Sequence, residues 1–164
     1  MKNTLRPVAL SIACLTLLLS RPVCAAEEPQ KSPTKRLNET ASPERNTVKI
    51  RLTIDGKTLT ASLNDTPAAR DFLSLLPLTL TLEDYASTEK IAYLPRKLTT
   101  KGAPAGFTPS AGDITYYAPW GNLAIFHKDF RYSEGLISLG RIDSGGETLK
   151  AHGTLLATIK RMEK

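Results

Sequence analysis

Aromatic and polar side chains gather in residues 112–127, where their types and spacing suit the binding of a ligand. Tyr117, Trp120 and Phe126 supply three aromatic rings, and His127 adds a polar group directly after them. Aromatic rings bury a large apolar area, and tyrosine and tryptophan also carry a polar group that can bond a ligand. We therefore expect these four residues to contribute to a binding site for a peptide segment or a small ligand.

A hairpin limits which of these rings can meet. Tyr116 and Tyr117 are neighbours in sequence, so a strand sends them to opposite faces and at most one of them reaches the site. Trp120 lies in a turn between Pro119 and Gly121, where full burial is difficult. The fixed φ of proline and the freedom of glycine to adopt a positive φ suit such a turn. Trp120 either contacts a ligand or covers one end of the fold.

The sequence holds no complete catalytic or metal-binding constellation. Its cysteines are Cys14 and Cys24, which both precede the expected folded region, so we expect no disulfide and no thiol chemistry there. His127 and His152 are isolated histidines without the ligand spacing of a metal site. No Gly-x-Ser-x-Gly nucleophile elbow accompanies the serines. We expect neither a metal nor a cofactor.

Residues 1–25 have the pattern of a secretory signal peptide: basic residues, a short apolar stretch, and small residues at a cleavage site. The apolar stretch, residues 8–19, is shorter than the about 20 residues that span a bilayer. We expect cleavage after Ala25 or Ala26, no stable membrane insertion of the mature chain, and a periplasmic or secreted location.

Residues 26–46 contain three prolines, mixed charges and few apolar side chains. Such a composition cannot bury enough surface to offset the entropy of ordering, so it predicts a disordered linker. The folded domain is then residues 47–164. Removal of the signal peptide takes away three basic residues and no acidic ones, which reduces the formal net charge of +6. A small excess of this kind argues against nucleic acid as a partner.

Alternating apolar residues predict a mostly β domain. Residues 47–54 alternate strictly, and Asp55-Gly56 then gives a strong hairpin signal before residues 57–63 alternate again. Further strands are expected at residues 78–82, 89–94, 113–118, 122–126, 136–142 and 154–160. Residues 96–109 are rich in Lys, Thr, Gly and Pro and predict a long loop.

One main helix is predicted between the second and third strands. Thr66 or Asp65 can cap its first turn, in which Pro67 is well placed, and Pro77 ends it. Its apolar residues recur at helical spacing and form one stripe. These residues are Ala69, Phe72, Leu73 and Leu76. We expect this stripe to pack on the sheet or to plug one end of a barrel.

Two segments resemble the bacterial cyclophilin-like family. Residues 108–126 contain the run Gly-Asp-Ile-Thr-Tyr-Tyr and a Pro-Trp-Gly turn, and residues 136–143 contain Leu-Gly-Arg-Ile. The similarity extends over residues 48–160. The resemblance implies a closed cyclophilin-like β-barrel of about eight strands with one main helix capping an open end.

The resemblance also implies an alternative function, weak peptidyl-prolyl cis-trans isomerisation. True cyclophilins use an arginine, a Phe-Met-x-Gln motif and a Trp or His at the pocket rim, and this chain has no Phe-Met-x-Gln run. Arg96 is the best candidate for the catalytic arginine, because a guanidinium can hydrogen-bond the prolyl amide. Without that role, Arg96 is either a polar contact for the bound ligand or a solvated loop residue.

Overall fold

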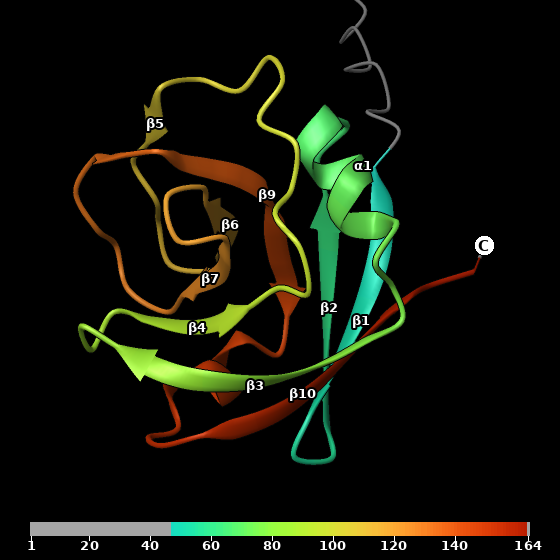
Figure 1. Ribbon diagram of the computed structural model, residues 1–164. Coiled ribbons are helices and arrows are strands. Elements are labelled where there is room, and N and C mark those ends of the chain that lie inside the picture. The colour runs from blue at the N-terminus through green and yellow to red at the C-terminus, as the bar shows by residue number, and fades with distance from the viewer. Residues whose placement is uncertain (1–46, 164) are drawn as a thin grey trace, which may run out of the picture. The chain divides into compact units, whose positions relative to one another are not determined.

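Eight strands close into an antiparallel barrel in the computed structural model, which describes residues 47–163 (Figure 1). Their order around the barrel is β1-β10-β3-β4-β7-β6-β9-β2, and the short strands β5 and β8 pair separately. The barrel strands are β1 (Val48–Ile54), β2 (Lys57–Leu63), β3 (Leu78–Tyr85), β4 (Glu89–Tyr93), β6 (Asp113–Tyr117), β7 (Asn122–Phe126), β9 (Leu136–Ser144) and β10 (Leu155–Arg161). The remaining elements are α1 (Pro67–Leu73), β5 (Gly106–Phe107), β8 (Ser133–Glu134) and the 3-10 helix η1 (Gly146–Lys150). The predicted fold class, a closed barrel with one main helix, is confirmed.

The predicted signal peptide, residues 1–25, and the predicted linker, residues 26–46, lie outside the described residues. Within residues 47–163, no helix has the length and apolar character needed to cross a membrane.

The inward side chains of β1 show how the alternating pattern builds the core. Ile50, Leu52 and Ile54 are each 0% exposed. Burying a side chain of this size stabilises the fold by about 1.5–3 kcal/mol. The turn after β1 has positive φ values at Asp55 and Gly56, of 46° and 79°, as a two-residue hairpin turn requires. The predicted first hairpin is therefore confirmed.

The barrel closes because β1 pairs with both its sequence neighbour and the last strand. β1 lies between β2 and β10, with Leu52 opposite Leu59 on one side and Ile159 on the other. The amide of Met162 donates to the carbonyl of Lys49 at 2.9 Å, which extends this pairing to the two ends of the domain. Closure leaves no unpaired strand edge in the barrel.

Helix α1 begins as predicted but ends earlier. The Thr66 hydroxyl accepts from the amide of Ala69, and Pro67 occupies the first turn. The helix ends at Leu73 rather than near Leu76, because the next amides bond three residues back in a tighter turn. Phe72 is 0% exposed and belongs to the barrel core, so α1 covers one end of the barrel (Figure 1).

The third strand is longer than the sequence pattern predicts. The predicted end at residue 82 is wrong, because β3 continues through Tyr85 and pairs with β4 there. The turn that follows has positive φ at Ala86 and Ser87, of 48° and 55°. These residues lack the chemistry of a typical hairpin turn. The extension places Tyr85 directly opposite Glu89.

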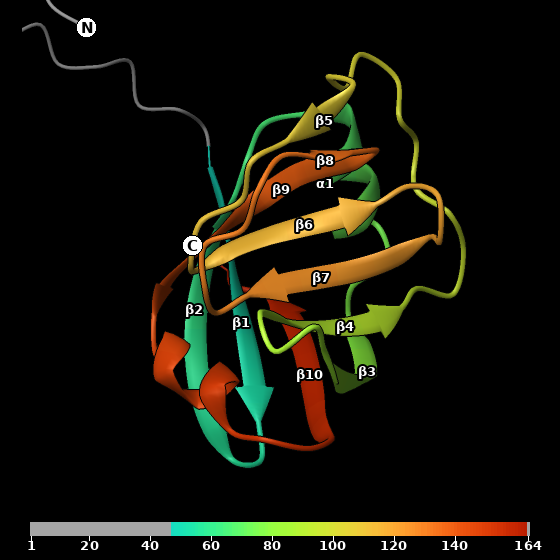
Figure 2. The ribbon, with the colours of Figure 1, turned by 90° about the vertical axis from the view of Figure 1, so that its left-hand side faces the viewer.

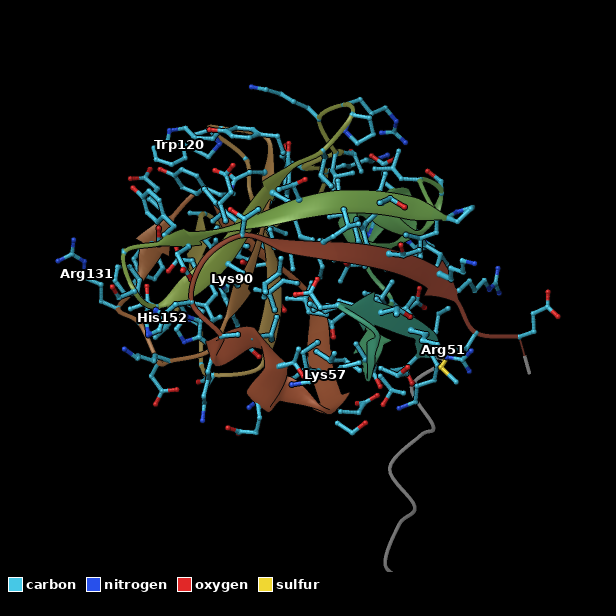
Figure 3. The ribbon with its side chains drawn as sticks, turned by 90° about the horizontal axis from the view of Figure 1, so that it is seen from below. Arg51, Lys57, Lys90, Trp120, Arg131 and His152 are labelled. Carbon is cyan, nitrogen blue, oxygen red and sulfur yellow. The ribbon has the colours of Figure 1, made fainter. Side chains whose placement is uncertain are left out.

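Lys90 is a charged residue inside the barrel and is 0% exposed (Figure 3). Its Nζ lies 2.5 Å from Oδ1 of Asp84 and 2.8 Å from the carbonyl oxygen of Gly153. The other oxygen of Asp84 accepts from the amide of Gly153 at 2.6 Å. The hydrogen bond from Lys90 holds the pKa of Asp84 below its usual value. This network joins the β3–β4 hairpin to the loop before β10.

The two motifs of the family resemblance meet in a second network. Arg141 on β9 donates to Oδ1 of Asp113 at 2.6 Å and to the carbonyl oxygen of Ala111 at 2.7 Å. Asp113 also accepts from the amide of Ser110 at 2.8 Å. Gly140 allows β9 to approach β2 closely, since a Cβ there would lie 2.2 Å from the carbonyl oxygen of Ser62. These motif residues therefore hold the barrel together.

We predict an asymmetry between the two members of the Lys90–Asp84 pair. Asp84→Asn leaves a fully buried ammonium without its anion and should lower the free energy of unfolding by about 3 kcal/mol. Lys90→Met leaves a carboxylate whose side chain is 35% exposed, so solvent can stabilise it and the loss should be clearly smaller than in Asp84→Asn. Urea unfolding of both variants measures this difference. A larger loss in Lys90→Met would contradict the burial argument.

Candidate functional site

A cavity of about 170 Å³ lies on the outer face of the barrel, on the side formed by β4, β7, β6 and β9 (Figure 2). A cavity of roughly 150 Å³ holds a benzene molecule, so this one has room for a small ring or the end of one side chain. The residues that line it are Tyr85, Glu89, Ile91, Tyr117, Trp120, Asn122, Ala124, Phe126, Phe130, Ser133 and Leu136.

Strand β7 supplies the floor of the cavity because its alternate residues face outward. Leu123 and Ile125 belong to the barrel core, whereas Asn122, Ala124 and Phe126 line the cavity. All five residues are buried. Strands buried on both faces read as nearly continuous apolar runs, which is the pattern of this segment.

A second apolar cluster covers the outer face beside the cavity. Phe126 stacks on Phe130, with ring centroids 6.1 Å apart, and packs with Ala124 and Leu136. Phe107 joins this cluster from β5, which pairs with β8. The cluster fixes the chain on both sides of β8 and so forms one wall of the cavity.

Three aromatic rings form the rim of the cavity. The ring of Trp120 lies 5.5 Å from that of Tyr85 and 5.4 Å from that of Tyr117, with interplanar angles of 89° and 80°. Trp120 is 47% exposed and Tyr85 is 41% exposed, and Figure 3 shows Trp120 at the periphery of the molecule. Edge-to-face contacts of this kind hold the rings in place while leaving ring surface accessible.

Two buried polar residues line the cavity. Glu89 is 8% exposed, and its carboxylate accepts from the hydroxyl of Thr88. Burial raises the pKa of Glu89 above its ordinary value, against the weaker opposite effect of the Thr88 hydrogen bond. Asn122 is 2% exposed, and its Nδ2 donates to the carbonyl oxygen of Leu123 at 3.3 Å. Its Oδ1 is buried and has no partner among residues 47–163.

The structure brings together three of the five residues proposed from the sequence. Tyr117, Trp120 and Phe126 line the cavity, whereas Arg96 and His127 do not. Tyr116, the neighbour of Tyr117, is 0% exposed in the barrel core. The two tyrosines therefore occupy opposite faces of β6, as predicted.

Arg96 is engaged by helix α1 instead. Its Nη2 donates to Oδ1 of Asp71 at 2.6 Å and to the hydroxyl of Ser74 at 3.0 Å. Asp71 also accepts from the amide of Thr99 at 2.7 Å. The hydrogen bond from Arg96 is the main cause of the lowered pKa of Asp71, and the same bond raises the pKa of Arg96. This arginine ties the long loop to the helix.

His127 lines two other hollows, one of which it shares with Lys128, Lys150 and His152. Partial burial is the main cause of the lowered pKa of His127, and the positive charge of Lys128 lowers it further. No group of three His, Cys, Asp or Glu residues that could hold a metal ion occurs in residues 47–163.

Sequence reasoning missed Tyr85 and Glu89. Tyr85 lies beyond the strand predicted at residues 78–82, and Glu89 is only the first residue of the strand predicted at residues 89–94. No sequence signal marks their position, because it depends on the turn at residues 86–88, which places Tyr85 and Glu89 opposite each other on one face of the hairpin. That turn lacks glycine and asparagine, which are the residues that mark such turns.

Removal of the Glu89 charge should stabilise the protein in a pH-dependent way. Because the folded state raises the pKa of Glu89, the unfolded chain loses its proton first as the pH rises. Stability therefore falls between the ordinary pKa, near 4.5, and the raised folded value. We expect Glu89→Gln to exceed the wild type in stability at pH 8 and to match it at pH 4. Urea unfolding at both values tests this, and a stability difference independent of pH would contradict it.

Comparisons with known proteins agree with this architecture. The model of the cyclophilin-like family matches residues 52–160 of this chain. The fold is similar to the solution structure of the hypothetical protein AF2241 from Archaeoglobus fulgidus, with a TM-score of 0.53 and 16% identity. That match covers 74% of this chain and 100% of the archaeal chain, and at this identity it shows the fold alone. No curated protein sequence matches this chain significantly.

The family match extends over more than half of the chain, and the barrel order and the single α-helix of the described residues fit it. The chain therefore belongs to the cyclophilin-like family.

Proposed function

We propose that this protein is an exported cyclophilin-like domain that binds a peptide segment or a small ligand in the cavity on the outer face of β4, β7, β6 and β9. The observation that carries the proposal is the rim of the cavity. Trp120 and Tyr85 keep nearly half of their surface exposed, although they stand beside a hollow with a buried apolar floor. Binding sites typically combine such apolar walls with a few fixed polar groups, here Glu89 and Asn122.

The size of the cavity favours a single small group rather than a long segment held throughout its length. At about 170 Å³, it falls below the roughly 300–1,000 Å³ that is common for drug-sized ligands. A peptide would therefore insert one side chain into the cavity, and its remaining residues would lie over the exposed rings of Trp120 and Tyr85. This arrangement suits transient recognition of a chosen residue type.

Prolyl isomerisation has less support. The proposed role of Arg96 requires its guanidinium to reach the amide of a bound peptide, but it lies outside the lining and is engaged by Asp71 and Ser74. Within residues 47–163, no arginine or lysine lines the cavity. A ring of proline size would fit, but the group that should assist its rotation is elsewhere.

Export is part of the proposal and rests on the signal pattern of residues 1–25. The absence of cysteine beyond residue 24 means that the domain needs no oxidising compartment for its stability. N-terminal sequencing of the protein recovered from the periplasm or medium should give a chain that begins at residue 26 or 27. Recovery of the uncleaved chain in the cytoplasm would contradict export.

Ligand binding should be visible in the fluorescence of Trp120, the only tryptophan of the chain. A panel of short peptides with varied side chains should contain members that shift its emission. Ala124→Leu should abolish the shift, because Ala124 is on the cavity floor and 2% exposed, so the larger side chain fills the hollow. Tyr85→Ala should weaken binding roughly tenfold, as loss of an aromatic contact does.

Tyr93→Ala is the matched control. Tyr93 is a 64% exposed tyrosine on the adjacent strand and does not line the cavity, so its removal should leave binding unchanged. A protease-coupled assay on proline peptides forms the second arm, in which Arg96→Ala should match the wild type. If no peptide changes the emission of Trp120, the proposed binding site is refuted. If the rate of prolyl isomerisation falls in Arg96→Ala, the isomerase function is favoured instead.

A further inference from the structure

The charged residue of the cavity is acidic, whereas the chain as a whole carries an excess of basic residues. Lys and Arg outnumber Asp and Glu by 22 to 16 in the whole sequence. Among the described residues that line the cavity, however, there is no lysine, arginine or histidine, and Glu89 is the only acidic one. No described cation forms an ion pair with Glu89. The cavity thus offers a buried carboxylate without a counter-ion.

A second acceptor lies at the other end of the cavity. Glu89 stands opposite Phe126 on β7, whereas Asn122 stands opposite Tyr93, four positions along the strand. This separates the two backbone positions by roughly 13 Å. The unpartnered Oδ1 of Asn122 accepts and cannot donate. A buried acceptor without a donor is unfavourable, so both ends of the cavity favour a ligand that carries N–H groups.

The aromatic rim connects these two ends. Tyr85 lies opposite Glu89, and Tyr117 lies opposite Asn122. Trp120 contacts both tyrosine rings edge to face, so the indole stands between the two acceptors. A cation within about 6 Å of an aromatic centroid is attracted by the ring face, and tryptophan attracts it most strongly.

We propose, on the basis of the ligand-binding role above, that the cavity takes a primary alkylammonium group on an apolar stem. The ammonium pairs with the Glu89 carboxylate beside Tyr85 and Trp120. The stem lies on Ile91 and Ala124. A further N–H at the other end of the ligand donates to Oδ1 of Asn122.

A lysine residue within a peptide has all three features, since its backbone amide supplies the second donor. A free alkylamine has the ammonium and the stem but no amide. A quaternary ammonium satisfies the aromatic rim only, because it has no N–H to donate to either acceptor. The raised pKa of Glu89 agrees with a carboxylate that lacks its cation in the free protein.

Three probes separate these features in titrations of the full mature chain, followed by Trp120 emission and by calorimetry. Nα-acetyl-lysine N-methylamide has the ammonium, the stem and the amide. The norleucine counterpart lacks only the ammonium, and pentylamine lacks the amide. The lysine probe should bind at least roughly tenfold more tightly than the norleucine probe, as expected for a hydrogen-bonded charge. If pentylamine binds as tightly as the lysine probe, the natural ligand is a free amine. If pentylamine binds more weakly, the natural ligand is a lysine residue of a peptide.

Glu89→Gln keeps the shape of the side chain and removes its charge. It should lower the affinity for the lysine probe by roughly tenfold or more and leave the norleucine probe unaffected. Glu134→Gln is the matched control, because Glu134 is exposed and does not line the cavity. Urea unfolding shows that each variant is folded.

Two results would overturn the inference. If the lysine and norleucine probes bind equally well, or if Glu89→Gln binds the lysine probe like the wild type, the cavity binds ligands without selecting a cation. The proposed function then stands alone. If neither these probes nor any member of the peptide panel binds the wild type, both the proposed ligand-binding function and the proposed preference for a cation are refuted.

Discussion

The ion pair between the buried Lys90 and the partly exposed Asp84 is the constraint on which the site depends. An ammonium that is 0% exposed must keep its anion, so Asp84 has to stand opposite it on β3. Since adjacent residues of a strand point to opposite faces, the register that turns Lys90 and Asp84 toward the inner face of the sheet also places Tyr85 and Glu89 on its outer face. A slip of one residue would remove both from the cavity and would bury neither charge with its partner. The stability of the barrel end and the geometry of the rim therefore follow from one pairing.

Strands β6 and β7 serve two packed layers at once. Tyr116, Leu123 and Ile125 fill the barrel, and Tyr117, Ala124 and Phe126 form the outer cluster and the cavity. A strand with two buried faces has little freedom to shift, so the cavity floor is as fixed as the core. The exposed part of the site is its rim, where Trp120 and Tyr85 keep accessible ring surface and contact each other edge to face.

The sequence predicts those parts of the molecule that local patterns determine. The strand pattern and the Pro119–Gly121 turn predict the β6–β7 hairpin and the shared site of Tyr117, Trp120 and Phe126. The remainder depends on partners that are distant in sequence or on turns without a signal. The continuation of β3 depends on a turn with positive φ at Ala86 and Ser87, which neither residue type favours. Arg96 is held by Asp71, which lies 25 residues earlier in the sequence. The residues around Arg96 in the sequence do not indicate this distant partner.

The position of Arg96 and the charge of Glu89 together distinguish the two functions that the fold could support. Assistance of amide rotation, in the mechanism that the family resemblance implies, needs a donor aimed at the prolyl amide, and a guanidinium is suited to that task because it is always protonated. The cavity instead presents a carboxylate and an amide oxygen, which are both acceptors toward a ligand. Acceptors at these positions bind ligands that carry hydrogen-bond donors. They stabilise the planar and the twisted state of a prolyl amide equally, so they do not lower the barrier to its rotation. The arrangement therefore favours binding over isomerisation, for a reason that lies in the chemistry of the lining and is independent of the missing Phe-Met-x-Gln motif.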